Sequence, residues 1–272
     1  MAAKTSTEVT DLGVSCDFLL TALVRQGQEV AETLTQLVSP HHQEGDGEPA
    51  FLASTVARGR RLGASFNQLA QADLQVYAVN STLTVLRNLR DDLTPALANE
   101  IVRLRRKIQG HYVAPNMDGL GLQSPRLRVT KVMARQGDTI GERFRRDDLE
   151  TMLGTKADED DPFDPRQAAA PVIAITAELN RTVKLIRAGQ RDLDRARIER
   201  DRVKAEHGEL FVYTARSFEA DCRLAGMREL AAKVRPSERQ PGRRAEEEEE
   251  APPPTPEEGA ETIPEKEVDA TG

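Results

Sequence analysis

A chain of 272 residues with 31% charged and only 4% aromatic residues favours a helical class over a compact β-rich fold, and it is long enough for one large or two small domains. Its net charge of -7 arises in residues 237–272, which carry 12 acidic and 4 basic residues, whereas residues 1–236 carry 33 and 34. A nearly neutral body neither requires nor excludes a nucleic-acid partner, and the longest uncharged apolar run, Leu74–Leu86, is too short to span a bilayer.

The N-terminal segment predicts one helix of about 33 residues. Thr5 and Glu8 have the spacing of a capping box, and apolar residues follow at intervals of three and four. Proline disfavours the helical conformation in the residue before it, so this helix should end near Ser39-Pro40. A polar loop, His41–Glu48, should follow.

A second helical pattern of about 60 residues opens at Pro49 and continues to about Gly110. Pro95 interrupts this pattern, and Thr94 could cap a new helix that begins with this proline. The sequence leaves two alternatives open: a continuous helix, and a kink or short break near Asp92.

Residues 111–124 contain several glycines and prolines and predict an irregular crossing. Apolar and polar residues alternate over Leu127–Val132, which predicts one short strand. No partner strand is evident in the sequence, so this strand could pair with another copy or another protein. Asp138 could then cap a short helix that ends at Gly154.

The tetrapeptide Gly137–Ile140 follows this predicted strand and resembles the opening of a LysM peptidoglycan-binding module. The resemblance covers about 20 residues, and it implies a second strand downstream. An acidic linker at residues 155–165 takes the place of that strand. We therefore interpret the tetrapeptide as a turn and a helix cap.

A third long apolar pattern follows the linker. Asp164-Pro165 favours a helix start, and the pattern then covers Pro171–Pro236. Glycine is unfavourable inside a helix, so Gly189 and the pair His207-Gly208 are points where this helix could bend.

The two long patterns should fold back on each other. The predicted fold is mainly all-α: an elongated antiparallel helical bundle or coiled-coil-like hairpin, with the N-terminal helix laid along it and a small strand-plus-helix insertion. We divide the chain into residues 1–110, the insertion 111–165, the returning helix 166–236, and a Glu- and Pro-rich tail, 237–272, that should be disordered. The narrow apolar stripes favour further burial by self-association.

Two polar residues, Asp73 and Asn80, lie one heptad apart on the expected seam of the second helix. They could set register or partner choice, as a buried Asn does in coiled coils, or they could lie at the solvated margin of a drifting stripe. Cys16 and Cys222 fall on apolar stripes, where they could be buried free thiols or form a disulfide between distant helices.

The sequence lacks the residue spacings and motifs that are typical of a catalytic or metal site. The histidines lack metal-ligating spacing: His41, His42, His111 and His207. Gly119 and Gly121 belong to no phosphate-binding motif, and no Gly-x-Ser-x-Gly nucleophile elbow occurs. We therefore expect no enzyme activity, no metal and no cofactor.

The strongest local signal is a basic block between residues 101 and 146, which holds 11 basic and three acidic residues. Residues 147–164 then hold eight acidic residues and one Lys. The two blocks could neutralise each other within the fold or between copies, or the basic block could contact phosphates. Its basic residues are Arg103, Arg105, Arg106, Lys107, Arg126, Arg128, Lys131, Arg135, Arg143, Arg145 and Arg146.

These features predict a non-catalytic structural, scaffold or adaptor protein that acts by helical self-association or by docking a partner helix. The alternatives are a nucleic-acid-binding protein that uses the basic block, and an α-helical membrane-active or pore-forming component. We expect a soluble, cytoplasmic protein whose partner is a second copy or another helical protein.

Overall fold

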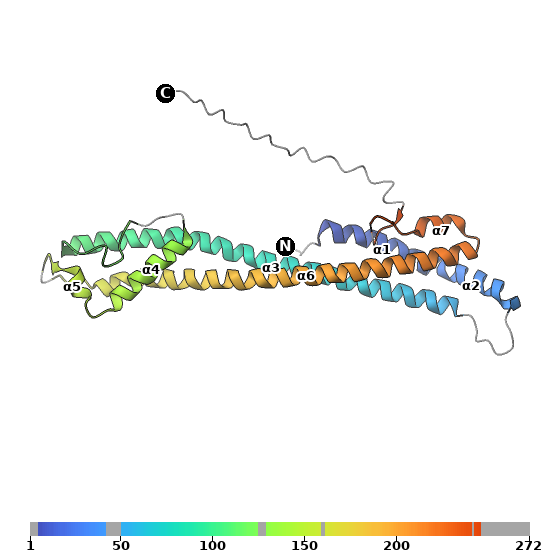
Figure 1. Cartoon of the computed structure of the whole chain (residues 1–272), viewed down its shortest axis with the longest axis horizontal. Helices are drawn as coiled ribbons and strands as arrows, with labels where there is room; N and C mark the ends of the chain where they lie inside the picture. The colour runs from blue at the N-terminus through green and yellow to red at the C-terminus, as the bar shows by residue number, and fades with distance from the viewer. Residues whose placement is uncertain (1–4, 42–49, 125–128, 159–160, 241, 246–272) are drawn as a thin grey trace, which may run out of the picture. The chain divides into compact units, whose positions relative to one another are not determined.

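The computed structural model describes residues 5–41, 50–124, 129–158, 161–240 and 242–245. Almost all regular structure in this part of the chain is helical, which confirms the predicted all-α class (Figure 1). The two predicted long helices are also confirmed, with 61 and 60 residues. The elements are α1 (Thr7–Arg25), α2 (Gly27–Val38), the 3-10 turn η1 (Ser39–His41), α3 (Phe51–His111), β1 (Tyr112–Val113), α4 (Thr130–Arg145), α5 (Leu149–Leu153), β2 (Thr155–Lys156), α6 (Pro165–Leu224) and α7 (Arg228–Val234).

The contacts divide the protein into two compact units. Of the described residues, unit 1 comprises residue 5 and those between 71 and 201, and unit 2 comprises those between 6 and 70 and between 202 and 245. The long helices α3 and α6 contribute to both units, and in each unit they run antiparallel. In unit 1, for example, the α6 partners run backward, from Arg200 to Gln190, as the α3 residues advance from Asp73 to Arg87.

Helix α3 is continuous through Pro95, which decides between the two alternatives for the second pattern. Proline has no N–H, so the carbonyl four residues earlier loses its helical donor. Thr94 does not cap a new helix; its hydroxyl donates to the carbonyl of Arg90 at 2.8 Å. Helix α6 likewise continues through Gly189 and Gly208, the points where it was expected to bend. Packing of the apolar faces therefore outweighs these unfavourable residues.

The N-terminal helix differs from its prediction at its start and in its middle. Ser6 rather than Thr5 is the N-cap, and its hydroxyl accepts the N–H three residues on at 3.4 Å. The helix also breaks at Gln26 into α1 and α2. A Cβ on Gly27 would lie 2.8 Å from the methyl group of Thr55, so the close approach to α3 after this break requires glycine. The predicted end near residue 39 is confirmed.

The predicted strand at Leu127–Val132 is wrong. Residues 125–128 lie outside the described part of the chain, and a helix, α4, begins at Thr130. Its apolar and small residues recur at intervals of three and four over 16 residues, and this longer pattern outweighs the short alternation before it. The buried residues of α4 are Met133, Ala134, Gly137, Ile140, Gly141 and Phe144.

The tetrapeptide Gly137–Ile140 lies inside α4, so its interpretation as a turn and cap is also wrong. A Cβ on Gly137 would lie 2.0 Å from Thr176 Oγ1, so the backbone of α4 packs directly against α6. Asp138 accepts a hydrogen bond from Asn180 of α6 at 2.9 Å. The predicted end at Gly154 is confirmed, because this residue terminates α5 with φ at 78°.

Two short strands that the sequence did not predict join the ends of α3 and α6 in unit 1. Strands β1 and β2 are antiparallel, with Tyr112 opposite Lys156. Beside them, the ring of His111 stacks on Phe163 at 4.1 Å between centroids and hydrogen-bonds to Asp161. That hydrogen bond is the main reason why the pKa of Asp161 is lowered. Among the described residues no strand of this unit is left unpaired.

The third pattern ends near Pro236 as predicted, but it is broken into two helices. Helix α6 stops, Gly226 turns the chain with φ at 78°, and the short helix α7 follows. Ser237, where the disordered tail was expected to begin, is buried, and its N–H donates to the carbonyl of Arg243 at 2.8 Å. The predicted tail is therefore wrong up to residue 245. Residues 246–272 lie outside the described part of the chain, as does the predicted loop at 42–49.

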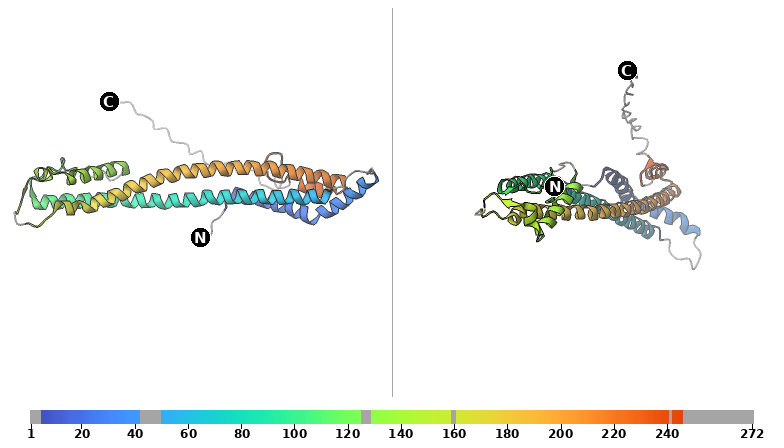
Figure 2. Two further views of the ribbon diagram at one scale, coloured as in Figure 1. Left: turned by 90° about the horizontal axis from the view of Figure 1, so that it is seen from below. Right: turned by 60° about the vertical axis from the view of Figure 1, so that its left-hand side comes forward.

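Each unit has its own apolar core. In unit 1, α4 and α5 lie beside α3 and α6 and enclose residues such as Ile101 and Phe144 (Figures 1 and 2). In unit 2, residues of α1, α2 and α7 join α3 and α6 around Phe211. Cys16 and Cys222 are free and fully buried in this second core, and burial raises the pKa of each thiol to about 12. The interpretation as buried free thiols is confirmed.

Candidate docking surface

Part of unit 1 is a pair of helices that extends beyond the core formed with α4 and α5. It comprises residues 71–92 of α3 and 181–201 of α6, and we call it the two-helix stretch. Leu83 and Leu193 are buried along this pair. A Cβ on Gly189 would lie 2.9 Å from Leu83 Cδ2, so glycine brings the two helices close together at this point.

Two polar contacts cross the seam of the two-helix stretch. Asp73 is only 4% exposed, and its carboxylate lies 3.8 Å from the guanidinium of Arg200. Arg87 donates to the side-chain carbonyl of Gln190 at 3.0 Å. A shift of either helix along the other would separate both pairs and leave polar groups against apolar ones.

The two register candidates therefore have different environments. Asp73 lies in the seam, as predicted, and a role in register stays a prediction. Asn80 does not lie in the seam: its side chain is exposed on α3. The heptad drifts between the two positions, so the prediction of a seam position is wrong for Asn80.

An uncharged surface lies on the outward side of α3 in the two-helix stretch, before the exposed Asp91 and Asp92. From residue 75 to residue 89, ten positions are exposed and all are uncharged. Three are large and apolar: Tyr77 is 44% exposed, Val85 65% and Leu89 37%. We call this surface the outer α3 face. Its residues are Gln75, Tyr77, Ala78, Asn80, Ser81, Thr82, Thr84, Val85, Asn88 and Leu89.

The polar groups of this face are partly satisfied by the helix itself. The hydroxyl of Thr82 donates to the carbonyl of Ala78 at 3.1 Å, and that of Thr84 donates to the carbonyl of Asn80 at 3.0 Å. A hydroxyl with an internal acceptor loses less when water is removed from the surface. The outer α3 face therefore combines apolar side chains with hydroxyls that need no water as acceptor.

The outward side of α6 in the same stretch has the opposite character. Of its twelve exposed positions between residues 181 and 201, ten are charged, and only Leu185 and Ile198 are apolar. Several of these charges pair locally, such as Arg195 with Asp192 at 3.7 Å. This side is typical of a solvated helix face. Its charged residues are Arg181, Lys184, Arg187, Arg191, Asp192, Asp194, Arg195, Arg197, Glu199 and Asp201.

The described residues of the basic block do not form a purely basic surface. Arg103, Arg106 and Lys107 are exposed on α3, where Arg103 lies 3.6 Å from Glu100. Arg105 donates to Ser124 at 3.1 Å. On α4, four basic residues, of which three are exposed and Arg143 is half-buried, flank two exposed carboxylates. The α4 residues concerned are Lys131, Arg135, Arg143 and Arg145, with Asp138 and Glu142 between them.

The acidic block does little to neutralise the basic one in the described part of the chain. Arg146 pairs with Asp148 at 3.0 Å across their junction. Asp161 instead contacts His111, and Asp164 accepts the N–H of Arg166 at the start of α6. Arg126 and Arg128 lie outside the described residues. Neutralisation within the fold is therefore limited among these residues, and phosphate contact stays a prediction.

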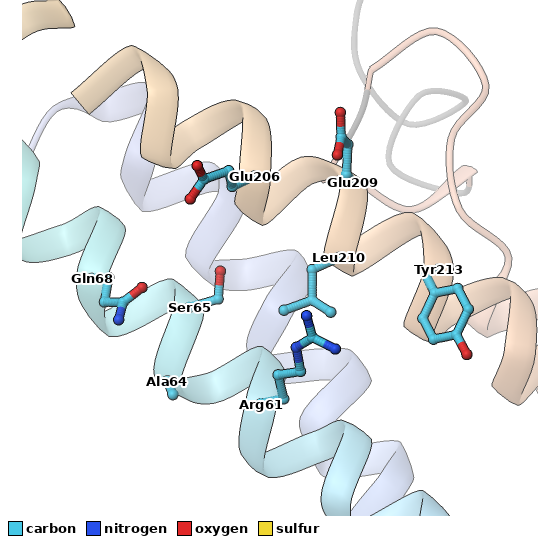
Figure 3. Close-up of a pocket in the computed structure, with 8 residues that line it drawn as sticks. All are labelled: Arg61, Ala64, Ser65, Gln68, Glu206, Glu209, Leu210 and Tyr213. Carbon is cyan, nitrogen blue, oxygen red and sulfur yellow. The ribbon is translucent and has the colours of Figure 1, made fainter. Parts of the chain in front are cut away.

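Unit 2 contains a groove of about 630 Å³ between α3 and α6. Arg61 and Ser65 of α3 and Glu206 and Glu209 of α6 line it (Figure 3). Below it, His207 is fully buried, and its Nδ1 lies 3.3 Å from Ser65 Oγ. Desolvation lowers the pKa of this histidine to about 4.

This serine and histidine do not form a complete catalytic arrangement. The second ring nitrogen of His207, Nε2, has no hydrogen-bond partner among the described residues. The ring lies instead near Phe66 and Phe211, at 5.7 Å and 6.5 Å between centroids. A general base needs a group that orients it, and two phenylalanines cannot do this. We interpret His207 as a buried core residue.

No group of three or more His, Cys, Asp or Glu side chains in the described ranges could hold a metal ion. No helix there has both the length and the apolar character needed to cross a membrane.

No family model, no curated protein and no solved structure matches this chain. The interpretation of its surfaces therefore depends on the chemistry of the residues themselves. The sequence did contain a signal for the outer α3 face: the uncharged run Leu74–Leu86 in a chain with 31% charged residues. Periodicity alone could not show which of these residues face outward, because the seam of the pair is itself polar.

Proposed function

We propose that this protein is a non-catalytic structural or adaptor protein that docks a helix on the outer α3 face. The observation that carries the proposal is the contrast within one pair of helices: the exposed positions of α3 between residues 75 and 89 are uncharged, and those of α6 between residues 181 and 201 are almost all charged. Burying a charged side chain costs free energy unless it is paired, whereas the outer α3 face has no charge to desolvate.

The shape of this face favours a helix as the partner. Tyr77, Ser81, Val85 and Leu89 follow one another at intervals of four, so they form a single ridge along the helix. Their neighbours Ala78 and Thr82 have smaller side chains and are also exposed. Ridges of one helix pack into grooves of another, and large side chains that project next to small ones provide the knobs and holes.

The proposal is tested by site-specific photo-cross-linking in cells that produce the full chain. A photoreactive amino acid replaces Val85 in one variant and Ile198, its exposed β-branched counterpart on α6, in the other. We expect a protein adduct from position 85 at least about fivefold more abundant than from position 198, since docked residues stay in contact with a partner. The substitution Tyr77→Glu should remove the adduct without lowering the melting temperature of the purified chain.

Equal adduct yields at the two positions would contradict the proposal. An adduct from position 85 that persists in the Tyr77→Glu background would also contradict it, because a charge on the ridge should prevent docking. The unchanged melting temperature serves as the control for folding, since Tyr77 is exposed in the isolated chain.

A further inference from the structure

The described residues that follow α7, 235–240 and 242–245, fold back on themselves in unit 2 (Figure 1). The N–H of Ser237 donates to the carbonyl of Arg243 at 2.8 Å, and that of Ala245 donates to the carbonyl of Arg235 at 3.0 Å. The two stretches also form an isolated antiparallel bridge. These hydrogen bonds lie within the segment, so they shape it without attaching it to α1.

Two neighbouring arginines attach this segment to α1. The guanidinium of Arg243 lies 2.9 Å from the carboxylate of Asp11. The guanidinium of Arg244 lies over the ring of Phe18, 3.7 Å from its centroid. Asp11 and Phe18 are seven residues apart, so they lie on the same face of the helix about two turns apart. The two arginine side chains therefore diverge along α1, one toward a carboxylate and the other toward an aromatic ring.

The residue before these arginines has to be glycine. Gly242 has φ at 92°, a conformation that residues with a side chain rarely adopt. It is also buried, and an added Cβ would lie 2.8 Å from Leu12 Cδ2 and 3.9 Å from the Cα of Gly208 on α6. The backbone at this position therefore fits closely beside both helices. Each residue of the sequence Gly-Arg-Arg thus makes a contact that its side chain, or the absence of one, requires.

The charge of α1 favours a basic ligand at this face. The helix carries three carboxylates, Glu8, Asp11 and Asp17, and one basic residue, Arg25, in its last turn. A guanidinium group can pair with a carboxylate, and it can also stack on an aromatic ring such as that of Phe18. Arginine is therefore the side chain that suits both contact points.

The contacts of this segment with α1 are open to exchange. The side chains of Arg243 and Asp11 are 26% and 45% exposed, so water screens their attraction. We infer that α1 carries a docking site for a Gly-Arg-Arg segment of a second protein, and that residues 242–244 occupy it in the structure as a releasable clasp. This site goes beyond the proposed function and does not depend on it, because every residue involved belongs to unit 2.

The clasp regulates access to the site because it belongs to the same chain. A short tether gives residues 242–244 an effective concentration at α1 on the order of millimolar, so a free segment in solution competes poorly. A second copy of the chain has no advantage, because its own clasp already makes the same contacts with its own α1. The site therefore favours a different protein, whose Gly-Arg-Arg segment acts together with a further contact.

A labelled peptide with the sequence of residues 236–245 tests the site on the full-length chain by fluorescence anisotropy. Two variants vacate the site: Gly242→Val, whose side chain overlaps Leu12, and Arg243→Glu, which sets a second carboxylate against the first. We expect both to bind the peptide at least about tenfold more tightly than the unmodified chain, because the clasp no longer competes. The matched control is Arg239→Glu, the same charge change at an exposed residue of the segment, which should bind no more tightly than the unmodified chain.

A further substitution on α1 locates the site. Asp11→Lys, added to either vacated variant, should weaken peptide binding at least about tenfold. Binding that Asp11→Lys leaves unchanged overturns the location, and equal affinity for the unmodified and vacated chains overturns the clasp as occupant. Absence of binding to both vacated variants overturns the site itself. If Arg243→Glu and the unmodified chain elute together as a mixed dimer in size exclusion, the occupant is a second copy, and the choice of a different protein is overturned.

Discussion

Helices α3 and α6 form two different seams along their length, one in each unit. In the two-helix stretch of unit 1, the carboxylate of Asp73 is buried, and a guanidinium from the facing helix pairs with it. In unit 2, α1 packs over the pair, with Gly13 so close to Phe66 that a Cβ would lie 2.8 Å from its ring. One polar residue buried there is His207, which is fully buried and has one nitrogen without a partner among the described residues.

The number of helices that pack around a seam controls the chemistry of its polar residues. A pair of helices leaves each seam residue near water, so a charge can persist if a partner faces it. A third helix excludes water, and the neutral form of an ionisable group is then favoured. A third helix packed on the pair would also cover part of its outward side. The outer α3 face accordingly lies in the two-helix stretch.

The largest loss of stability should come from disturbing the packing of α4 on α6 in unit 1. Gly137 brings α4 onto α6 in unit 1, and Gly137→Val would place two methyl groups where Thr176 Oγ1 already lies 2.0 Å from an added Cβ. We expect the free energy of unfolding to fall by about 3 kcal/mol, measured by urea denaturation.

The control for this substitution is Gly110→Ala. A Cβ there meets nothing within 4 Å, and alanine is the better helix former, so the free energy of unfolding should stay the same or rise by up to about 1 kcal/mol. If Gly137→Val is as stable as the unmodified chain, α4 does not cover unit 1 through this contact.

The next effect concerns the pH dependence of unit 2. The folded-state pKa of His207 is about 4, below the ordinary value of about 6.5 that it regains on unfolding. Between these two values the unfolded chain binds a proton that the folded chain does not, so the stability contributed by neutral His207 is present above about pH 6.5 and is lost as the pH falls toward 4. The loss should approach about 3 kcal/mol.

His207→Leu isolates this contribution, because the carboxylates of the chain titrate equally in both proteins. We expect the free energy of unfolding of the variant, relative to the unmodified chain, to rise by about 2 to 3 kcal/mol between about pH 7 and pH 4.5. Groups that face the ring are Ser65, Phe66 and Phe211, none of which titrates in this range. If the free energies of unfolding of the two proteins change in parallel with pH, the prediction is contradicted, and water reaches His207 in this seam.

The sequence predicted the helical class and both long helices because their apolar stripes persist over many turns. It failed where two short patterns competed. The alternation at Leu127–Val132 favoured a strand, but Gly137 lies against Thr176, a residue about 40 positions further on, and no local pattern reveals that contact. The same limit applies to the outer α3 face: the uncharged run was visible, but which of its residues face outward depends on how α6 packs.

The smallest effects should distinguish the two register candidates. Asp73→Ala removes a carboxylate from the seam but does not leave Arg200 unpaired, because Arg200 also lies 2.7 Å from Asp201. We therefore expect a loss of only about 1 kcal/mol in the free energy of unfolding. Asn80→Ala changes an exposed side chain and should alter this value by less than about 0.5 kcal/mol.

These two substitutions lie one heptad apart and differ in burial. Comparing their effects on the free energy of unfolding therefore measures what the seam position contributes. Both replace a polar residue of α3 by alanine, one heptad apart, and both gain helix propensity. A loss for Asn80→Ala equal to that for Asp73→Ala would place Asn80 in the seam after all, against its exposure in the structure. If Asp73→Ala alone is costly, the polar seam is defined by the pair with Arg200, and Asn80 belongs to the outer α3 face.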